Sequence, residues 1–192
     1  MKKIEKKIIC ELLVKDKAKL IVYSDKDYDK CYFDSWLYFF DGKKEYELIN
    51  DSFAFTIGMG LYKRLFDLNE YNGDDFENEL KNHNNSDFYE KISQKFELSE
   101  CKNYELYLFK DKGKIKFLLY DVKIISREKK GIIYKYKKFY ETEISADSLI
   151  QWRNILEREY LPRYIQELKK SIKNISKEQI LTAVNSLKNN QN

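Results

Sequence analysis

The chain has 192 residues, of which 43% are hydrophobic, 16% are aromatic and 35% are charged, and its formal net charge is +4. This apolar content excludes a disordered protein, and the shortness of the apolar runs excludes a membrane-spanning helix, which needs ~20 apolar residues. The sequence has one histidine and no complete catalytic or cofactor motif, so it favours a protein that works by contact rather than by turnover.

The length predicts one α+β domain over residues 1–173, followed by a helix over residues 174–192 that docks on the domain and ends in a frayed tail. The apolar run of residues 8–14 is interrupted by Glu11 and is typical of a strand, not of a targeting segment. Three separated cysteines predict buried, reduced thiols rather than disulfides or a metal site. We therefore expect a cytoplasmic protein.

Four β-rich segments occupy the first fifty residues. They cover residues 4–14, 20–23, 30–40 and 45–49. Polar turns separate them, including the pair Asp41 and Gly42, which is typical of a hairpin. The pattern predicts a four-stranded antiparallel meander.

The next fifty residues change to a helical period. Phe76 and Leu80 fall on one helical face, and residues 61–68 are also expected to be helical. Phe88, Ile92 and Phe96 repeat every four residues and predict a further helix. The sequence leaves open whether this helical stretch covers a sheet or bridges two sheets.

A second β block and two helices complete the chain. Strands are expected over residues 104–109, 115–125 and 132–140. Ser145 should cap a helix, and Pro162, which lacks an N–H, should kink or break it near Tyr160. The apolar face of this helix should carry Trp152, Leu156, Tyr160, Tyr164 and Leu168. The order predicts an α+β fold with two antiparallel β-meanders, separated by a helical segment, and C-terminal helices packed on the sheet.

Charge is distributed unevenly along the chain. Residues 51–100 contain 5 basic and 11 acidic side chains, whereas residues 102–138 contain 12 basic and 4 acidic ones. Such blocks bear on partners and on the long-range electric field, not on the fold. Three functional hypotheses follow from these blocks and from one short motif.

The acidic block supports the first hypothesis. Asp74, Asp75, Glu77 and Glu79 stand at the start of a predicted helix, where they complement the helix dipole and are able to dock on a basic partner. Together with Tyr- and Trp-rich strands that we expect to be exposed as binding hot spots, they predict a small protein-binding inhibitor. It would be an immunity-type protein, or a phage- or mobile-element-encoded antagonist, that acts by stoichiometric contact on a host or nucleic-acid-processing enzyme.

The basic block supports nucleic-acid binding as the alternative, because lysines neutralise phosphates and tyrosine rings stack on bases. Strand alternation places Lys135 and Lys137 on one side and Tyr134, Tyr136 and Lys138 on the other. The competing interpretation is therefore a solvated edge strand protected by lysines. The candidate nucleic-acid-binding residues are Arg127, Lys129, Lys130, Tyr134, Lys135, Tyr136, Lys137 and Lys138.

The third hypothesis comes from the segment Ile-Lys-Phe-Leu-Leu-Tyr-Asp-Val-Lys, where Asp121 and Lys123 follow three apolar residues on one strand face. This short segment resembles the D-x-K end of the strand found in PD-(D/E)xK nucleases. The resemblance implies carboxylates that hold Mg²⁺ and a lysine that orients or activates water. The upstream acid is missing, with Asp111 in the turn instead, so Glu97 or Glu100 would have to complete the site. The alternative is a solvated ion pair beyond the core.

The remaining motifs predict neither a cofactor nor a metal. Gly58 and Gly60 precede a predicted helix, but they lack the third glycine of a dinucleotide-binding fingerprint and the spacing of a phosphate-binding loop. His83 stands alone in a polar loop, so one chain cannot build a site with several histidines.

Overall fold

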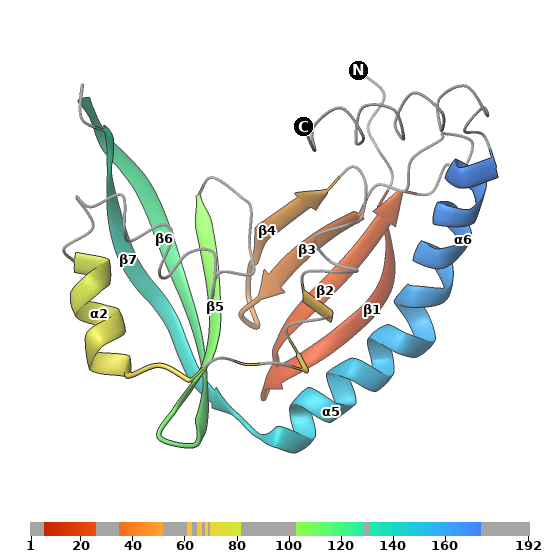
Figure 1. The fold of residues 1–192 in the computed structure, drawn as a ribbon, viewed down its shortest axis with the longest axis horizontal. Coiled ribbons are helices and arrows are strands. Elements are labelled where there is room, and N and C mark those ends of the chain that lie inside the picture. The colour runs from red at the N-terminus through yellow and green to blue at the C-terminus, as the bar shows by residue number, and fades with distance from the viewer. Residues whose placement is uncertain are drawn as a thin grey trace, which may run out of the picture.

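Four consecutive strands form the first sheet. The computed structural model describes residues 6–25, 35–51, 61–62, 65–66, 68, 70–81, 103–128 and 131–173. The strands β1 (Lys6–Lys15), β2 (Ala18–Asp25), β3 (Ser35–Phe40) and β4 (Glu45–Asp51) pair antiparallel in the order β1-β2-β3-β4 (Figure 1). The predicted four-stranded meander is confirmed.

The second sheet contains β5 (Tyr104–Asp111), β6 (Lys114–Glu128) and β7 (Gly131–Ile144), in the order β5-β6-β7. Lys112 and Gly113 join β5 to β6 with φ angles of 51° and 79°, a turn conformation whose twist suits a hairpin. Tyr104, the first residue of β5, pairs with Asp121, so β6 and β7 continue beyond that point as a long hairpin (Figure 1).

One hydrophobic core lies between the two sheets. Phe39 of β3 packs against Phe117 of β6 and Tyr140 of β7, with ring centroids 5.8 and 4.7 Å away. Fully buried leucines from both sheets fill much of the remaining space: Leu12, Leu20, Leu37, Leu106 and Leu119. One face of β6 therefore belongs to this core.

A C-terminal helix runs along the first sheet. It comprises α5 (Ala146–Ile155), the π-helical segment η3 (Leu156–Tyr160) and α6 (Leu161–Lys173) (Figure 1). The Ser145 hydroxyl accepts a hydrogen bond from the Ser148 N–H at 3.0 Å and caps α5 as predicted. Trp152 is buried, and its Nε1–H donates to the Leu13 carbonyl of β1 at 2.8 Å. With this helix packed on the sheet, the predicted α+β architecture is confirmed.

The helix passes Pro162 through a π segment instead of ending before it. The Leu161 N–H donates to the carbonyl of Leu156, five residues earlier, which widens the turn. A wider turn relieves the clash between a proline ring and the carbonyl four residues before it. The predicted irregularity near Tyr160 is present, but the helix continues. Its buried face carries Trp152, Leu156, Tyr160 and Tyr164.

A short helix covers the outer face of the second sheet. α2 (Gly73–Lys81) starts after Asn72, whose side-chain oxygen accepts hydrogen bonds from the N–H groups of Asp74 and Asp75 at 2.8 and 3.3 Å. Phe76 and Leu80 lie on one face of α2, as predicted, and are buried in a second hydrophobic cluster. The sheet members of this cluster are Tyr107, Phe109, Leu118, Tyr120 and Val122. Apolar side chains are therefore buried on both faces of the second sheet.

Some predictions fall partly or wholly outside the described residues. Within the predicted helix of residues 61–68, the Leu65 N–H bonds to the Leu61 carbonyl at 3.2 Å, as in a helical turn. The predicted helices around Ile92 and over residues 174–192 lie outside the described residues, as do Gly58, Gly60 and His83. In the part of the chain that is described, no helix is long and apolar enough to cross a membrane.

Replacing Phe76 tests whether this side chain holds α2 on the sheet. Its ring centroid lies 5.0 Å from that of Tyr107 and 4.9 Å from that of Phe109. A helix of 9 residues is too short to be stable alone. Phe76→Ala should therefore lower the free energy of unfolding by ~3–5 kcal/mol, measured by urea unfolding. The control Ile150→Ala, on an exposed side chain of α5, should change it by less than ~0.5 kcal/mol. Equal losses in both variants would contradict this anchoring role.

Candidate functional site

An open pocket lies between α2 and the outer face of the second sheet. Its volume is about 450 Å³, within the range typical of small-ligand sites. The lining residues come from α2 and from all three strands of the sheet: Gly73, Asp74, Glu77, Asn78, Phe109, Asp111, Lys116, Leu118 and Glu141. Phe109 and Leu118 are buried and form the apolar part of the lining, whereas most of the other lining residues are charged.

Strand alternation explains why these residues share one face. Ile115, Phe117 and Leu119 face the core between the sheets, so Lys116 and Leu118 must face the other way. Lys116 pairs with Phe109 on β5, and Leu118 pairs with Glu141 on β7. Residues that pair directly across strands project to the same side of the sheet. The charged pocket thus lies on the face of β6 that points away from the core between the sheets.

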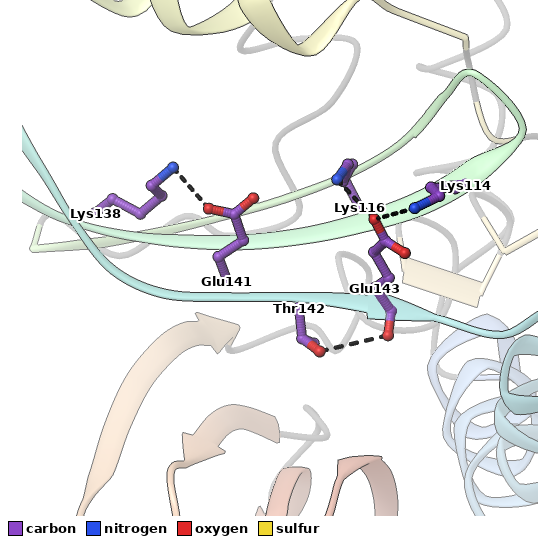
Figure 2. Close-up of polar contacts among 6 residues, drawn as sticks. All are labelled: Lys114, Lys116, Lys138, Glu141, Thr142 and Glu143. Carbon is purple, nitrogen blue, oxygen red and sulfur yellow. Dashed lines mark hydrogen bonds and ion pairs between the residues drawn. The ribbon is translucent and has the colours of Figure 1, made fainter.

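A network of ion pairs borders the pocket. Glu143 accepts from Lys114 at 3.1 Å and from Lys116 at 2.9 Å, while Lys138 pairs with Glu141 at 2.7 Å (Figure 2). Lys138 also pairs with Glu77 of α2 at 2.5 Å and so joins the helix to the sheet. Figure 2 shows Thr142 on the opposite side of β7 from its neighbours Glu141 and Glu143.

The hydrogen bonds of this network shift the pKa values of Glu143, Lys116 and Lys138. Bonds from Lys116 and Lys114 lower the pKa of Glu143, and the same contact raises the pKa of Lys116. Partial burial on its own would lower the pKa of Lys138, but hydrogen bonds to Glu141 and Glu77 outweigh burial and raise it. These groups therefore stay charged at neutral pH.

A β-bulge in β7 aims Lys138 at α2. Leu119 pairs with Tyr140, but Tyr120 pairs with Lys138, so Phe139 is an extra residue in β7. Phe139 and Tyr140 both pack against the core between the sheets. Without the extra residue in this strand, strict alternation from Tyr140 would turn Lys138 towards that core instead of towards Glu77.

The four acidic residues predicted to bind a partner divide into two pairs. Glu77 is paired with Lys138, and Glu79 accepts a hydrogen bond from the Tyr71 hydroxyl at 2.9 Å. Asp74 and Asp75 are exposed, and neither forms an ion pair with a described residue. Of these four residues, only Asp74 and Asp75 therefore offer carboxylates that form no ion pair or side-chain hydrogen bond with a described residue.

The basic hairpin separates its charges from its rings, as predicted. Lys135 and Lys137 are exposed on one face, whereas Tyr136 packs on Tyr120 with ring centroids 6.3 Å apart. Lys138 lies on the Tyr136 side, in the ion pairs described above. Lys129 and Lys130 lie outside the described residues, and so do the side chains of Arg127 and Tyr134.

Asp121 and Lys123 form an ion pair with each other at 3.6 Å. Their side chains are 30% and 72% exposed, at the end of the apolar run of β6, so the geometry is that of a solvated pair. Asp111 lies at the other end of the sheet, in the pocket. Among the described residues, no three His, Cys, Asp or Glu side chains are grouped as metal ligands would be, and Glu97 and Glu100 lie outside that part of the chain.

Burial changes the interpretation of two kinds of side chain. The tryptophans are not exposed hot spots, because Trp36 and Trp152 are 4% and 1% exposed.

Glu105 was not among the predicted site residues, yet burial raises its pKa to about 7 even though the Tyr107 hydroxyl donates a hydrogen bond to it. Alternation along β5 places Glu105 on the same strand face as the apolar side chains of Tyr107 and Phe109. This pattern in the sequence could have indicated that Glu105 is buried.

Comparisons of the chain with protein-family models, with curated proteins and with solved structures find no significant match.

Glu105 should make the stability of the protein depend on pH. Its pKa is about 7 in the folded state and about 4.5 ordinarily, so between these values only the folded state keeps the proton. The free energy of unfolding should therefore fall as pH rises through this window, by up to ~1.4 kcal/mol per pH unit from this group. Urea unfolding across the window measures the slope. Glu105→Gln should remove this contribution, whereas Glu11→Gln should not. Parallel curves for wild type and Glu105→Gln would contradict the assignment.

Proposed function

We propose that the protein is a small binding or inhibitory protein that acts by stoichiometric contact with another protein. The proposal rests on one observation: Asp74 and Asp75 are exposed and not ion-paired within the described residues, beside a pocket rich in carboxylates. In this proposal α2 docks on a basic surface, such as the nucleic-acid-binding surface of an enzyme that processes nucleic acids. An immunity-type protein, or an antagonist encoded by a phage or mobile element and acting in the cytoplasm, fits this mode of action.

A fixed backbone beneath the acidic side chains supports this choice. Asn72 fixes the first turn of α2, and Phe76 and Leu80 fix the helix on the sheet. A helix backbone held in one place loses little conformational freedom when a partner binds, and complementary charge accelerates the encounter. The first turn of α2 is therefore well suited to recognise a basic surface.

Reversing the two exposed charges tests this interface. A tagged chain would capture its partner from the native cell type, with nuclease added to remove nucleic-acid bridges. Asp74→Lys with Asp75→Lys should weaken capture by tenfold or more, since several charge-assisted contacts would become repulsive. The control Asp16→Lys with Asp147→Lys changes the net charge equally, at two exposed carboxylates in the turn between β1 and β2 and in the first turn of α5.

Three results would count against the proposal. Capture that survives the α2 double variant would refute this placement of the interface. Equal losses in both double variants would indicate an effect of net charge alone. A preparation that holds nucleic acid and no protein partner would favour the second candidate function.

Nucleic-acid binding is the second candidate, and a cross-strand pair of like charges favours it. Lys123 of β6 pairs directly with Lys135 of β7, and Lys137 stands opposite Asp121 on the same face. Like charges directly opposite one another destabilise a sheet, and the carboxylate of Asp121 is paired with Lys123, which leaves Lys135 and Lys137 without an ion pair among the described residues. A phosphate backbone lying along this hairpin would neutralise them.

Salt dependence tests this second candidate. Affinity for a fluorescent single-stranded oligonucleotide should fall with rising salt, with a log–log slope of about −0.7 for each phosphate that the protein neutralises. Lys135→Glu with Lys137→Glu should reduce the affinity and make the slope shallower. The control Lys15→Glu with Lys17→Glu, at the turn between β1 and β2, should leave them unchanged. Salt-independent binding, or no binding at low salt, would rule this candidate out.

A further inference from the structure

The pocket beside α2 keeps a surplus of negative charge. Its lining holds four carboxylates and a single lysine, Lys116, which is already paired with Glu143. Lys138 compensates Glu77 and Glu141 from the edge of the pocket. Asp74 on α2 and Asp111 on β5 form no ion pair with a described residue. Two carboxylates from different elements therefore remain available to a cation.

The shape of the pocket combines these carboxylates with an apolar surface. Phe109 and Leu118 contribute buried side chains to the lining. A Cβ atom at Gly73 would come within 2.8 Å of Asp111 Oδ2, so the glycine allows the start of α2 to lie close to that carboxylate. A ligand that fits both parts has a long apolar stem and a positively charged end.

A buried hydroxyl lies next to the ion pairs that border the pocket. Tyr120 is almost fully buried, and its hydroxyl has no hydrogen-bond partner among the described residues. Burial raises its pKa, and the nearby charge of Glu77 adds to this effect, so the hydroxyl stays protonated. An unsatisfied buried hydroxyl is costly, but Tyr120 does not line the pocket, so its oxygen is not a contact for a ligand bound there.

We propose that this pocket receives an arginine side chain of the protein partner. The stem of the arginine would lie over Phe109 and Leu118, and its guanidinium group between Asp74 and Asp111. Arginine suits this arrangement because its planar group presents five donors and keeps its charge when partly buried. The inference rests on the proposed function and adds to it the kind of residue that the partner must present.

A small probe tests the pocket without the partner. The ¹⁵N-labelled full-length chain would be titrated with Nα-acetyl-arginine methylamide and followed by NMR. We expect binding with a dissociation constant on the order of millimolar, and shifts of the amide signals of the pocket residues. The neutral analogue Nα-acetyl-citrulline methylamide should bind at least ~tenfold more weakly, because it lacks the charge. Equal binding of both probes, or shifts confined to other surfaces, would overturn the proposal.

Matched variants locate the binding groups. Asp74→Asn with Asp111→Asn should weaken binding of the arginine probe by ~tenfold or more. Asp75→Asn is the control, because Asp75 is exposed on the same helix but does not line the pocket. Asn78→Arg should fill the pocket from within, abolish probe binding and raise Tm, whereas Asn78→Gln should do neither. Probe binding that survives in Asn78→Arg, or an equal loss in Asp75→Asn, would also overturn the proposal.

Partner capture separates this inference from the function on which it rests. Asp111→Asn alters the pocket but not α2, and it should weaken capture of the partner by ~tenfold. If Asp111→Asn captures the partner normally while the α2 double variant does not, the proposed function stands and the pocket inference fails. If both capture it normally, the proposed placement of the interface fails as well.

Discussion

The middle strand of the second sheet is apolar on both faces, and the position of α2, the pocket and the charges depends on this constraint. Phe117 and Leu119 face the core between the sheets, while Leu118 and Tyr120 face the other way. Leaving the second face in water would cost about 25 cal/mol for each Å² of apolar surface. α2 provides the cover through Phe76, but a helix of 9 residues cannot cover a strand of 15 residues. The pocket is the part of this face that remains open beside the first turn of α2.

The acidic and basic blocks of the sequence meet at one ion pair among the described residues. α2 belongs to the acidic block, and the sheet that it covers carries the basic one. Glu77 meets Lys138 across this contact. This ion pair compensates one charge of each block inside the molecule. Exposed charges remain on the first turn of α2, at Asp74 and Asp75, and on the hairpin, at Lys135 and Lys137.

Local patterns predicted the elements well, whereas the site required distant contacts. Period-two and period-four apolar patterns are local properties, so the strands, the buried face of the C-terminal helix and the shared face of Phe76 and Leu80 follow from the sequence. The bulge at Phe139 depends on how β7 pairs with β6, so no local sequence pattern predicts it. Asp111 and Glu141 join Asp74 only through tertiary packing, for the same reason. The prediction for Trp36 was wrong: composition alone suggested an exposed side chain, but packing buries it.

The bulge at Phe139 has a further consequence for how copies of the chain meet. Within the described residues, β7 pairs with β6 on one side only, so its other edge carries backbone groups without a strand partner. A long, flat edge of this kind is a template on which another chain can add a strand. The extra residue bends β7 and interrupts its regular spacing of hydrogen-bonding groups. The irregularity that aims Lys138 at α2 thus also lowers the tendency of this aromatic-rich chain to aggregate edge to edge.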